Sequence, residues 1–245
     1  MKTYGLIGFR LSHSFSKKYF TEKFIKEGIE DCVYENFQLD TIKEFTALVN
    51  TDANFKGFNV TIPYKEDVIP FLDELDEAAQ EIGAINVIKV QDDGKLIGYN
   101  SDYYGFRDTL EKFISLGKHH NALVLGTGGA AKAVVTALKH LNIPYQYVSR
   151  KKGNGILSYD ELNEQIIKEH TIIINTSPLG MYPDIDSYPD IPYQFLTSNH
   201  YLYDLVYNPE ETVFMKKGIE KGAHVLNGLP MLIGQAEKAW EIWNK

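Results

Sequence analysis

The chain has 245 residues, 44% of them hydrophobic, which is enough for one large core or two smaller ones. Its formal net charge of −8 argues against a broad surface for nucleic acid or an anionic membrane, because phosphate groups are bound by clustered Lys and Arg. The single cysteine, Cys32, excludes an intramolecular disulfide, and no Cys/His group has the spacing of a metal site. Because no apolar run approaches bilayer length and the N-terminus does not resemble a signal peptide, we expect a cytoplasmic protein without a metal.

Short β-rich runs alternate with helical patterns along the chain. Asp93-Gly94 predicts a tight hairpin turn, and apolar residues share one helical face within 42–49 and again within 134–141. This alternation is typical of an α/β fold with mostly parallel strands. The expected strands are 3–8, 32–39, 55–62, 85–90, 121–126, 144–148, 171–177 and 200–206.

The same pattern predicts two domains. A second strand-helix series begins at residue 121, after a predicted helix over 102–115. The final stretch carries Leu232, Ala236 and Trp240 on one helical face, so it can return to pack on the first domain. We therefore expect a first domain of residues 1–101 completed by a helix over 229–245, and a second, Rossmann-type domain of residues 102–228.

A glycine-rich turn opens the second domain. Residues 122–131 predict a strand, the pattern Gly-x-Gly-x-x-Ala and the start of a helix, which is the context of a dinucleotide-binding fingerprint. Gly126 permits the tight turn and Gly128 lets the backbone approach a pyrophosphate. The helix start, with Gly129 and Ala130, offers amide groups and positive potential. A plain turn between a strand and a helix remains the alternative.

The next predicted strand indicates which cofactor binds. In an NAD site this strand ends in Asp or Glu, whereas here it leads into Ser149, Arg150 and Lys151. A guanidinium with a neighbouring ammonium matches the 2′-phosphate of NADP. We therefore expect NADP, with a solvated basic turn as the alternative.

Several further motifs, in order along nearly the whole chain, resemble those of the shikimate dehydrogenase family. The resemblance rests on an ordered set of segments, of which any single one could occur by chance. They are GFRLSHSFS (8–16), NVTIPYK (59–65), GAIN (83–86), NSD (100–102), the glycine turn, NTSPLGM (175–181), YDLVYNP (203–209) and GLPMLIGQAEKAW (228–240).

The resemblance implies a two-lobed enzyme of aromatic amino acid biosynthesis that reduces 3-dehydroshikimate to shikimate with NADP. In it the first lobe and the final helix bind shikimate, and the second lobe binds the cofactor. Its implied residues fall into three groups. They are Ser14 and Ser16 at the substrate carboxylate; Thr61, Lys65, Asn86, Asp102, Gln235 and Tyr207 around the rest of the substrate; and Thr176, Gly228 and Met231 along the cofactor.

The chemistry of ketone reduction gives two of these residues a role. Hydride addition leaves negative charge on the ketone oxygen, so a proton donor or cation is needed beside it. Lys65 can supply both, and Asp102 can keep Lys65 charged and oriented. The sequence does not assign the transferred proton to one member of the pair. Without the motifs, Lys65 would be interpreted as a solvated lysine and Asp102, like Ser14 and Ser16, as a helix cap.

The sequence departs from the family pattern at several positions, most of them near the expected carboxylate loop. Arg10 and Lys17 stand where the family usually has Pro, and His13 is interpreted as structural. The remaining departures are Tyr19-Phe20 for His-Asn, Val87 for Thr and Ser101 for Thr.

Two other functions stay open at this stage. One is a quinate/shikimate dehydrogenase that uses NAD or both cofactors. The other is a non-catalytic nucleotide sensor on the same fold, because a fold does not fix a function. The sequence does not determine the oligomeric state, and both a monomer and a homodimer stay open.

Overall fold

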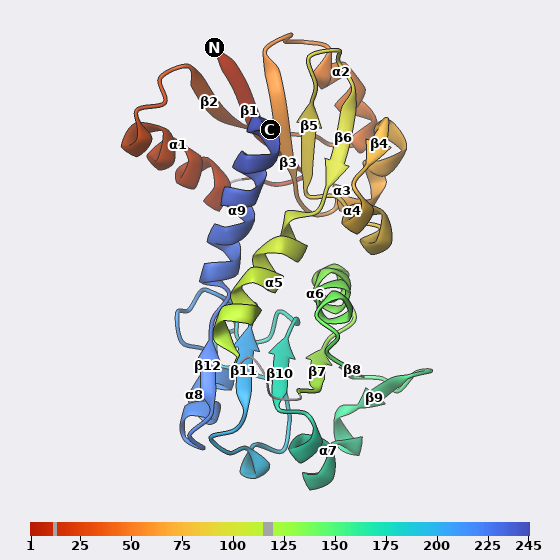
Figure 1. Ribbon diagram of the computed structural model, residues 1–245, viewed down its shortest axis with the longest axis vertical. Coiled ribbons are helices and arrows are strands. Elements are labelled where there is room, and N and C mark those ends of the chain that lie inside the picture. The colour runs from red at the N-terminus through yellow and green to blue at the C-terminus, as the bar shows by residue number, and fades with distance from the viewer. Residues whose placement is uncertain (12–13, 115–119) are drawn as a thin grey trace. The chain divides into compact units, whose positions relative to one another are not determined.

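The computed structural model describes residues 1–11, 14–114 and 120–245, so His13 lies outside the described residues. The chain divides into two compact units, one of residues 1–101 with 235–245 and one of residues 102–234. Each unit is built on its own six-stranded sheet (Figure 1). The expected α/β class is therefore confirmed. Within the described residues, no helix combines the length and the apolar character that a membrane span requires.

The sheet of the first unit is mixed. Its order is β2-β1-β3-β5-β6-β4, and β3 and β6 both pair antiparallel with β5. The predicted hairpin at Asp93-Gly94 joins β5 to β6, with Gly94 at φ +86°. The strands are β1 (Lys2–Gly8), β2 (Cys32–Gln38), β3 (Phe55–Val60), β4 (Glu74–Leu75), β5 (Val87–Val90) and β6 (Leu96–Tyr99).

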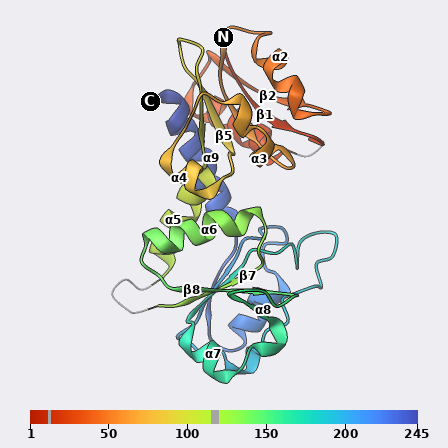
Figure 2. The same cartoon turned by 90° about the vertical axis from the view of Figure 1, so that its right-hand side faces the viewer.

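Helices cover both faces of this sheet. Figure 2 shows α2 (Phe45–Val49) and α3 (Tyr64–Asp67) on the opposite side of the sheet from α9 (Leu229–Asn244). On the α9 side, Trp243 and Ala239 pack with Tyr4 and Phe20. Only the part of α9 from Gln235 onward belongs to this unit. The other helical segments are α1 (Phe15–Glu27), α4 (Glu77–Ile82) and the 3-10 turns η1 (Ile42–Glu44) and η2 (Ile69–Phe71).

The sheet of the second unit is entirely parallel. Its order, β12-β11-β10-β7-β8-β9, is that of a doubly wound dinucleotide-binding fold, with the reversal of strand order between β7 and β10. Ligands of such sheets bind beyond the carboxyl ends of the strands at this reversal. The strands are β7 (Ala122–Leu125), β8 (Tyr145–Ser149), β9 (Ile156–Ser158), β10 (Ile172–Asn175), β11 (Tyr201–Asp204) and β12 (His224–Leu226).

Helices lie on both sides of this second sheet. In Figure 2, α6 (Gly129–His140) lies on one side, with α7 (Glu164–Glu169) and α8 (Val213–Ile219) on the other. The predicted helix over 102–115 is α5, which begins at Ser101 and ends at Phe113. Strands β9 and β12 and helices α7 and α8 were not predicted, because segments of three to seven residues show too little periodicity. Two further 3-10 turns are η3 (Tyr159–Glu161) and η4 (Tyr193–Phe195).

Candidate active site

The glycine turn lies at the strand-order reversal of the second sheet. Gly126 follows β7 with φ +116°, a conformation that side chains with a Cβ rarely adopt. A Cβ on Gly126 would also lie 2.7 Å from the Thr176 hydroxyl oxygen. That hydroxyl donates a hydrogen bond to the Leu125 carbonyl at 2.9 Å, which joins the ends of β7 and β10. The structure therefore brings Gly126 and Thr176 together.

The start of α6 presents its backbone to the surroundings. Gly128 precedes the helix without a side-chain cap, and Gly128, Gly129 and Ala130 are exposed. A Cβ added at Gly128 or Gly129 would meet no atom within 4 Å. By contrast, Ala131 is fully buried, so the helix packs closely on the sheet. The exposed amides and the helix dipole together suit an anionic group such as a pyrophosphate.

The cations of the basic turn after β8 differ in whether they already contact a carboxylate. Lys152 pairs with Glu161, and this contact holds the pKa of Glu161 down to about 2. Arg150 and Lys151 are exposed and form no ion pair within the described ranges. Two cations thus remain available beside Ser149, where an NAD site would carry an acid.

Tyr207 and Gly228 follow β11 and β12, the strands beyond β10 from the glycine turn, and Met231 lies in the first turn of α9. Gly228 donates a backbone hydrogen bond to the Val206 carbonyl at 3.1 Å, and a Cβ on it would lie 2.1 Å from the Leu205 carbonyl oxygen. Only glycine allows this close approach. Tyr207 is 41% exposed, whereas Met231 is buried. The structure therefore brings Gly228 against the backbone that leads to Tyr207.

In the first unit, a buried amide joins three of the motifs. Asn86 accepts a hydrogen bond from the Ser101 backbone amide at 2.6 Å and donates one to the Gln235 side chain at 3.3 Å. Asn86 is only 4% exposed, so its carboxamide is fixed by these contacts. The GAIN, NSD and C-terminal motifs therefore meet at Asn86.

Two residues that extend this network were missed in the sequence. The Tyr34 hydroxyl donates to the Asn59 side-chain oxygen at 2.7 Å, and the Asn59 amide donates to the Asn86 carbonyl at 3.2 Å. Burial raises the pKa of Tyr34, and the Ser16 hydroxyl opposes this shift. Asn is depleted in strands, so an Asn inside the predicted strand 55–62 was a usable signal for Asn59.

Ser14, Thr61 and Lys65 lie at element ends of the first unit. Ser14 caps α1, accepting from the Lys17 amide at 3.1 Å, as the capping alternative proposed. Thr61 follows β3, and its amide donates to the Ile7 carbonyl at 2.9 Å. Lys65 is half-buried in α3, and its carbonyl accepts from the Ile85 amide at 2.7 Å. This backbone contact holds the NVTIPYK and GAIN motifs against each other.

Asp102 is the second residue of α5 and is 8% exposed. Because the helix begins at Ser101, Asp102 is not the capping residue, and its carboxylate lies in the first turn, where the helix dipole favours negative charge. Asp102 belongs to the second unit and Lys65 to the first, so their pairing stays a prediction.

The departures from the family pattern have local physical explanations. Lys17 forms an ion pair with Glu35 on β2. Tyr19 is hydrogen-bonded to Glu237 on α9, and the fully buried Phe20 stacks on Tyr34 with ring centroids 4.7 Å apart. These residues secure α1 to its neighbours.

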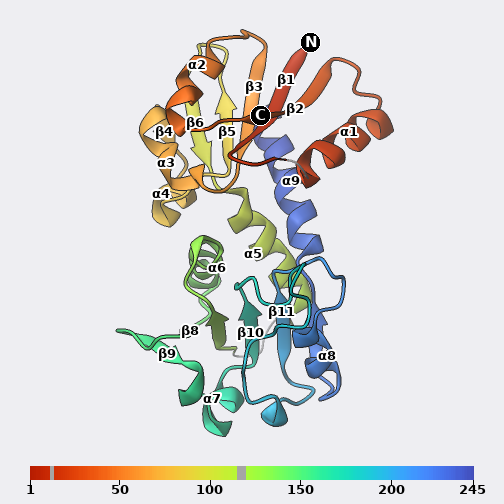
Figure 3. The same ribbon diagram turned by 180° about the vertical axis from the view of Figure 1, so that it is seen from behind.

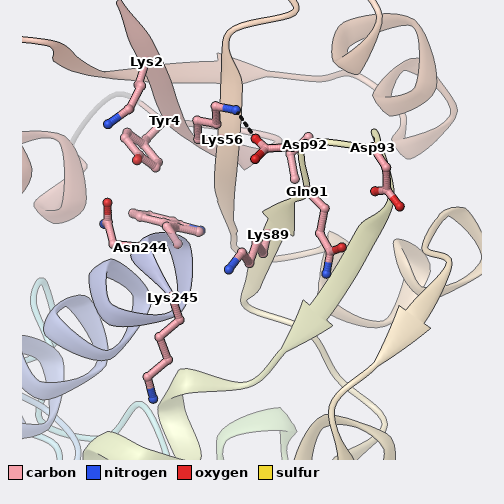
Figure 4. A pocket seen from close by; sticks show the side chains of 11 residues that line it. Lys2, Tyr4, Lys56, Lys89, Gln91, Asp92, Asp93, Asn244 and Lys245 are labelled. Atoms are coloured by element: carbon pink, nitrogen blue, oxygen red, sulfur yellow. Dashed lines mark hydrogen bonds and ion pairs between the residues drawn. The ribbon is translucent and has the colours of Figure 1, made fainter.

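A pocket of about 680 Å³ in the first unit contains none of the predicted site residues. Figure 4 shows lysines from β1, β3 and β5 and the terminal Lys245 around it, among them Lys56, which contacts Asp92 at 2.8 Å. Lys2 and Lys245 are likewise paired, with Asp31 and Glu241. Since three of the four lysines already face carboxylates, this pocket is a weak anion site. The described part of the chain also contains no cluster of three metal-ligating side chains.

The doubly wound sheet, the exposed helix start and the glycine turn define a two-unit α/β protein with a dinucleotide-binding fold. Comparison with known families narrows this class. Residues 6–88 match the family model described as the shikimate dehydrogenase substrate binding domain. The shikimate dehydrogenase (NADP(+)) of Clostridium beijerinckii is 43% identical over 257 residues, covering 100% of this chain and 93% of that protein. The chain belongs to the shikimate dehydrogenase family.

Solved structures of the family agree with the fold. Shikimate 5-dehydrogenase of Thermus thermophilus, in complex with NADP(H) and shikimate, is 28% identical with a TM-score of 0.85, covering 99% of this chain and 93% of that one. The enzyme of Listeria monocytogenes, in complex with shikimate and NAD, is also 28% identical, with a TM-score of 0.89 and coverage of 99% and 91%.

Proposed function

We propose that the protein catalyses the reversible, NADP-dependent reduction of 3-dehydroshikimate to shikimate. The observation that carries this proposal is the 43% identity, over the whole chain, to a protein named shikimate dehydrogenase (NADP(+)). The exposed start of α6 and the exposed cations Arg150 and Lys151, which pair with no carboxylate among the described residues, support the choice of cofactor.

The residues of the second unit fit NADP. Because a Cβ at Gly128 or Gly129 would meet no atom within 4 Å, a pyrophosphate could approach the backbone there, and the amides at the start of α6 would bind it. Arg150 and Lys151, with Ser149, would hold the 2′-phosphate through charge-assisted hydrogen bonds. Thr176, Gly228 and Met231 would line the remainder of the dinucleotide.

Lys65 and Asp102 would carry the proton transfer. NADPH, when bound, would supply the hydride that reduces the ketone carbon. As negative charge develops on the ketone oxygen, the Lys65 ammonium stabilises it and donates a proton, which forms the hydroxyl group. In the oxidation direction, Lys65 or the Lys65/Asp102 pair accepts the hydroxyl proton.

The first unit would bind shikimate through fixed polar groups. Ser14 and Ser16 would donate to the carboxylate at the start of α1. Asn86 and Gln235 already contact each other, which leaves the remaining amide hydrogens to donate to ring hydroxyls. Thr61 and Tyr207 would complete the contacts with the substrate.

The remaining proposals concern organisation and context. We assign substrate binding to residues 1–101 with the helix over 229–245, and NADP binding to residues 102–228. A monomer or a homodimer is compatible with this assignment. The single cysteine favours the cytoplasm and the acidic net charge argues against nucleic-acid or membrane partners.

The deciding experiment measures oxidation of shikimate and of quinate, each with NADP and with NAD, by the increase in absorbance of the reduced cofactor. We expect the highest kcat/KM with shikimate and NADP. Comparable rates with quinate or NAD would instead support a quinate/shikimate dehydrogenase. Cofactor binding without turnover of either substrate would identify a non-catalytic nucleotide sensor.

A further inference from the structure

A fully buried carboxylate lies where β10 and β11 end. The two strands lie side by side (Figure 3), and Asn175 is the register partner of Asp204. Asp204 has an exposed fraction of 0% and accepts three hydrogen bonds. The donors are the Asn175 amide at 2.9 Å, the Val206 backbone at 3.0 Å and the Thr212 hydroxyl at 2.6 Å.

Each donor belongs to a different functional segment. The Asn175 side-chain oxygen also accepts from the Ser177 amide and hydroxyl, at 3.1 and 2.6 Å, which shapes the loop that carries Thr176. The Val206 carbonyl accepts from the Gly228 amide, and Val206 directly precedes Tyr207.

The third donor, Thr212, also begins a helix. Its hydroxyl oxygen accepts from the Met215 amide at 3.3 Å and so caps α8. The carboxylate of Asp204 therefore joins the loop after β10, the loop after β11 and the start of α8.

The burial of this carboxylate has a cost. Desolvation raises the pKa of Asp204 to about 6, although the three donors oppose the shift. No cation forms an ion pair with Asp204 in the parts of the chain that the structure describes. A buried charge without a countercharge is weak evidence for a stabilising role and is typical of functional positions.

We propose that Asp204 is a positioning residue, which holds the Thr176 loop and, through Val206, the turn at Gly228 in the arrangement that binds NADPH. The inference rests on the proposed function. A carboxylate suits this role because all three neighbouring groups are donors, and a carboxylate is acceptor-only. A merely structural Asp204 would affect melting temperature without changing the affinity of the folded protein.

The test measures the NADPH dissociation constant of full-length Asp204→Ala and Asp204→Asn by calorimetry, well below their melting temperatures. Asp204→Ala leaves three buried donors unpaired, so we expect NADPH binding to weaken roughly ten- to hundredfold. Asp204→Asn keeps one acceptor oxygen and should recover part of this loss. The KM for NADPH should follow the dissociation constant.

The matched control is Asn163→Ala, which removes the side-chain cap of α7, away from the two loops. This variant should lower the melting temperature and leave NADPH affinity unchanged. If Asp204→Ala does not fold, Asn175→Ala takes its place in the comparison. This variant removes the side-chain link between the two loops. Wild-type affinity in the folded Asp204 or Asn175 variants would overturn the proposal. A wild-type protein that binds NADPH without oxidising shikimate would contradict the proposed function alone.

Discussion

The two units are expected to hold their ligands by different means. In the second unit the main groups are backbone amides at the start of α6, exposed because Gly128 and Gly129 carry no side chain. In the first unit they are side chains fixed by one another, such as Asn86 between Ser101 and Gln235. A backbone site depends on a short local pattern, whereas a side-chain site depends on residues far apart in the sequence.

The largest expected effect concerns the side-chain site. Lys65→Ala should lower kcat by about 10²- to 10⁴-fold, because it removes the proposed proton donor. Shikimate binding should be largely retained, as measured by titration with shikimate. The matched control is Lys56→Ala, which removes a lysine paired with Asp92 outside the site. A kcat near the wild-type value would exclude Lys65 as the acid, and loss of binding alone would make it a positioning residue.

The difference between a local backbone site and a long-range side-chain site also explains which features the sequence predicted. The glycine turn and the basic turn after β8 were predictable, because strand, turn and helix are contiguous in the sequence. The contacts of Asn59 and Asp204 were not, because Tyr34 and Asn175 are 25 and 29 residues away. Their partners are defined only once β2 pairs with β1, and β10 with β11.

The next effect concerns stability and pH. Because the folded-state pKa of Asp204 is raised from 3.8 to about 6, folding favours its protonated form. The stability this group contributes is fully present below about pH 4 and is lost as pH rises through about 6, a change of about 3 kcal/mol.

This loss can be isolated by comparison with Asp204→Asn, which stays neutral throughout. Denaturant unfolding at pH 4, 5, 6 and 7 should show the wild-type protein losing stability relative to the variant as pH rises. A difference in stability that does not depend on pH would mean that Asp204 keeps its ordinary pKa. The hydrogen bonds from its three donors would then offset the cost of its burial.

A third effect sharpens the assignment of the basic turn. Arg150→Gln should raise the KM for NADPH by about one to two powers of ten and leave that for NADH unchanged, because a charge-assisted hydrogen bond contributes roughly 1.5–3 kcal/mol. Lys152→Gln is the matched control, since Lys152 is already paired with Glu161. Steady-state kinetics with both cofactors measure the two KM values in each variant. Equal weakening of both cofactors by Arg150→Gln would make the turn a solvated surface feature.

The smallest effect concerns the departures around α1. Lys17 pairs with Glu35, but their side chains are 43% and 45% exposed, and exposed ion pairs contribute about 0–1 kcal/mol. Lys17→Ala should therefore lower the melting temperature by less than about 4 °C. In this variant the backbone amide of residue 17 still donates to the Ser14 hydroxyl, so the cap of α1 is kept. The KM for shikimate should therefore stay within about twofold of wild type.

Lys17→Pro restores the residue that the family usually has and removes the amide that Ser14 accepts from. Comparing the two variants separates the charge of Lys17 from its backbone hydrogen bond. If only Lys17→Pro changes the KM for shikimate, the Ser14 cap sets the geometry at the carboxylate. If Lys17→Ala changes it as much, the ammonium group itself acts on the substrate, and the first unit binds its anion by charge, as we propose for the second unit at Arg150.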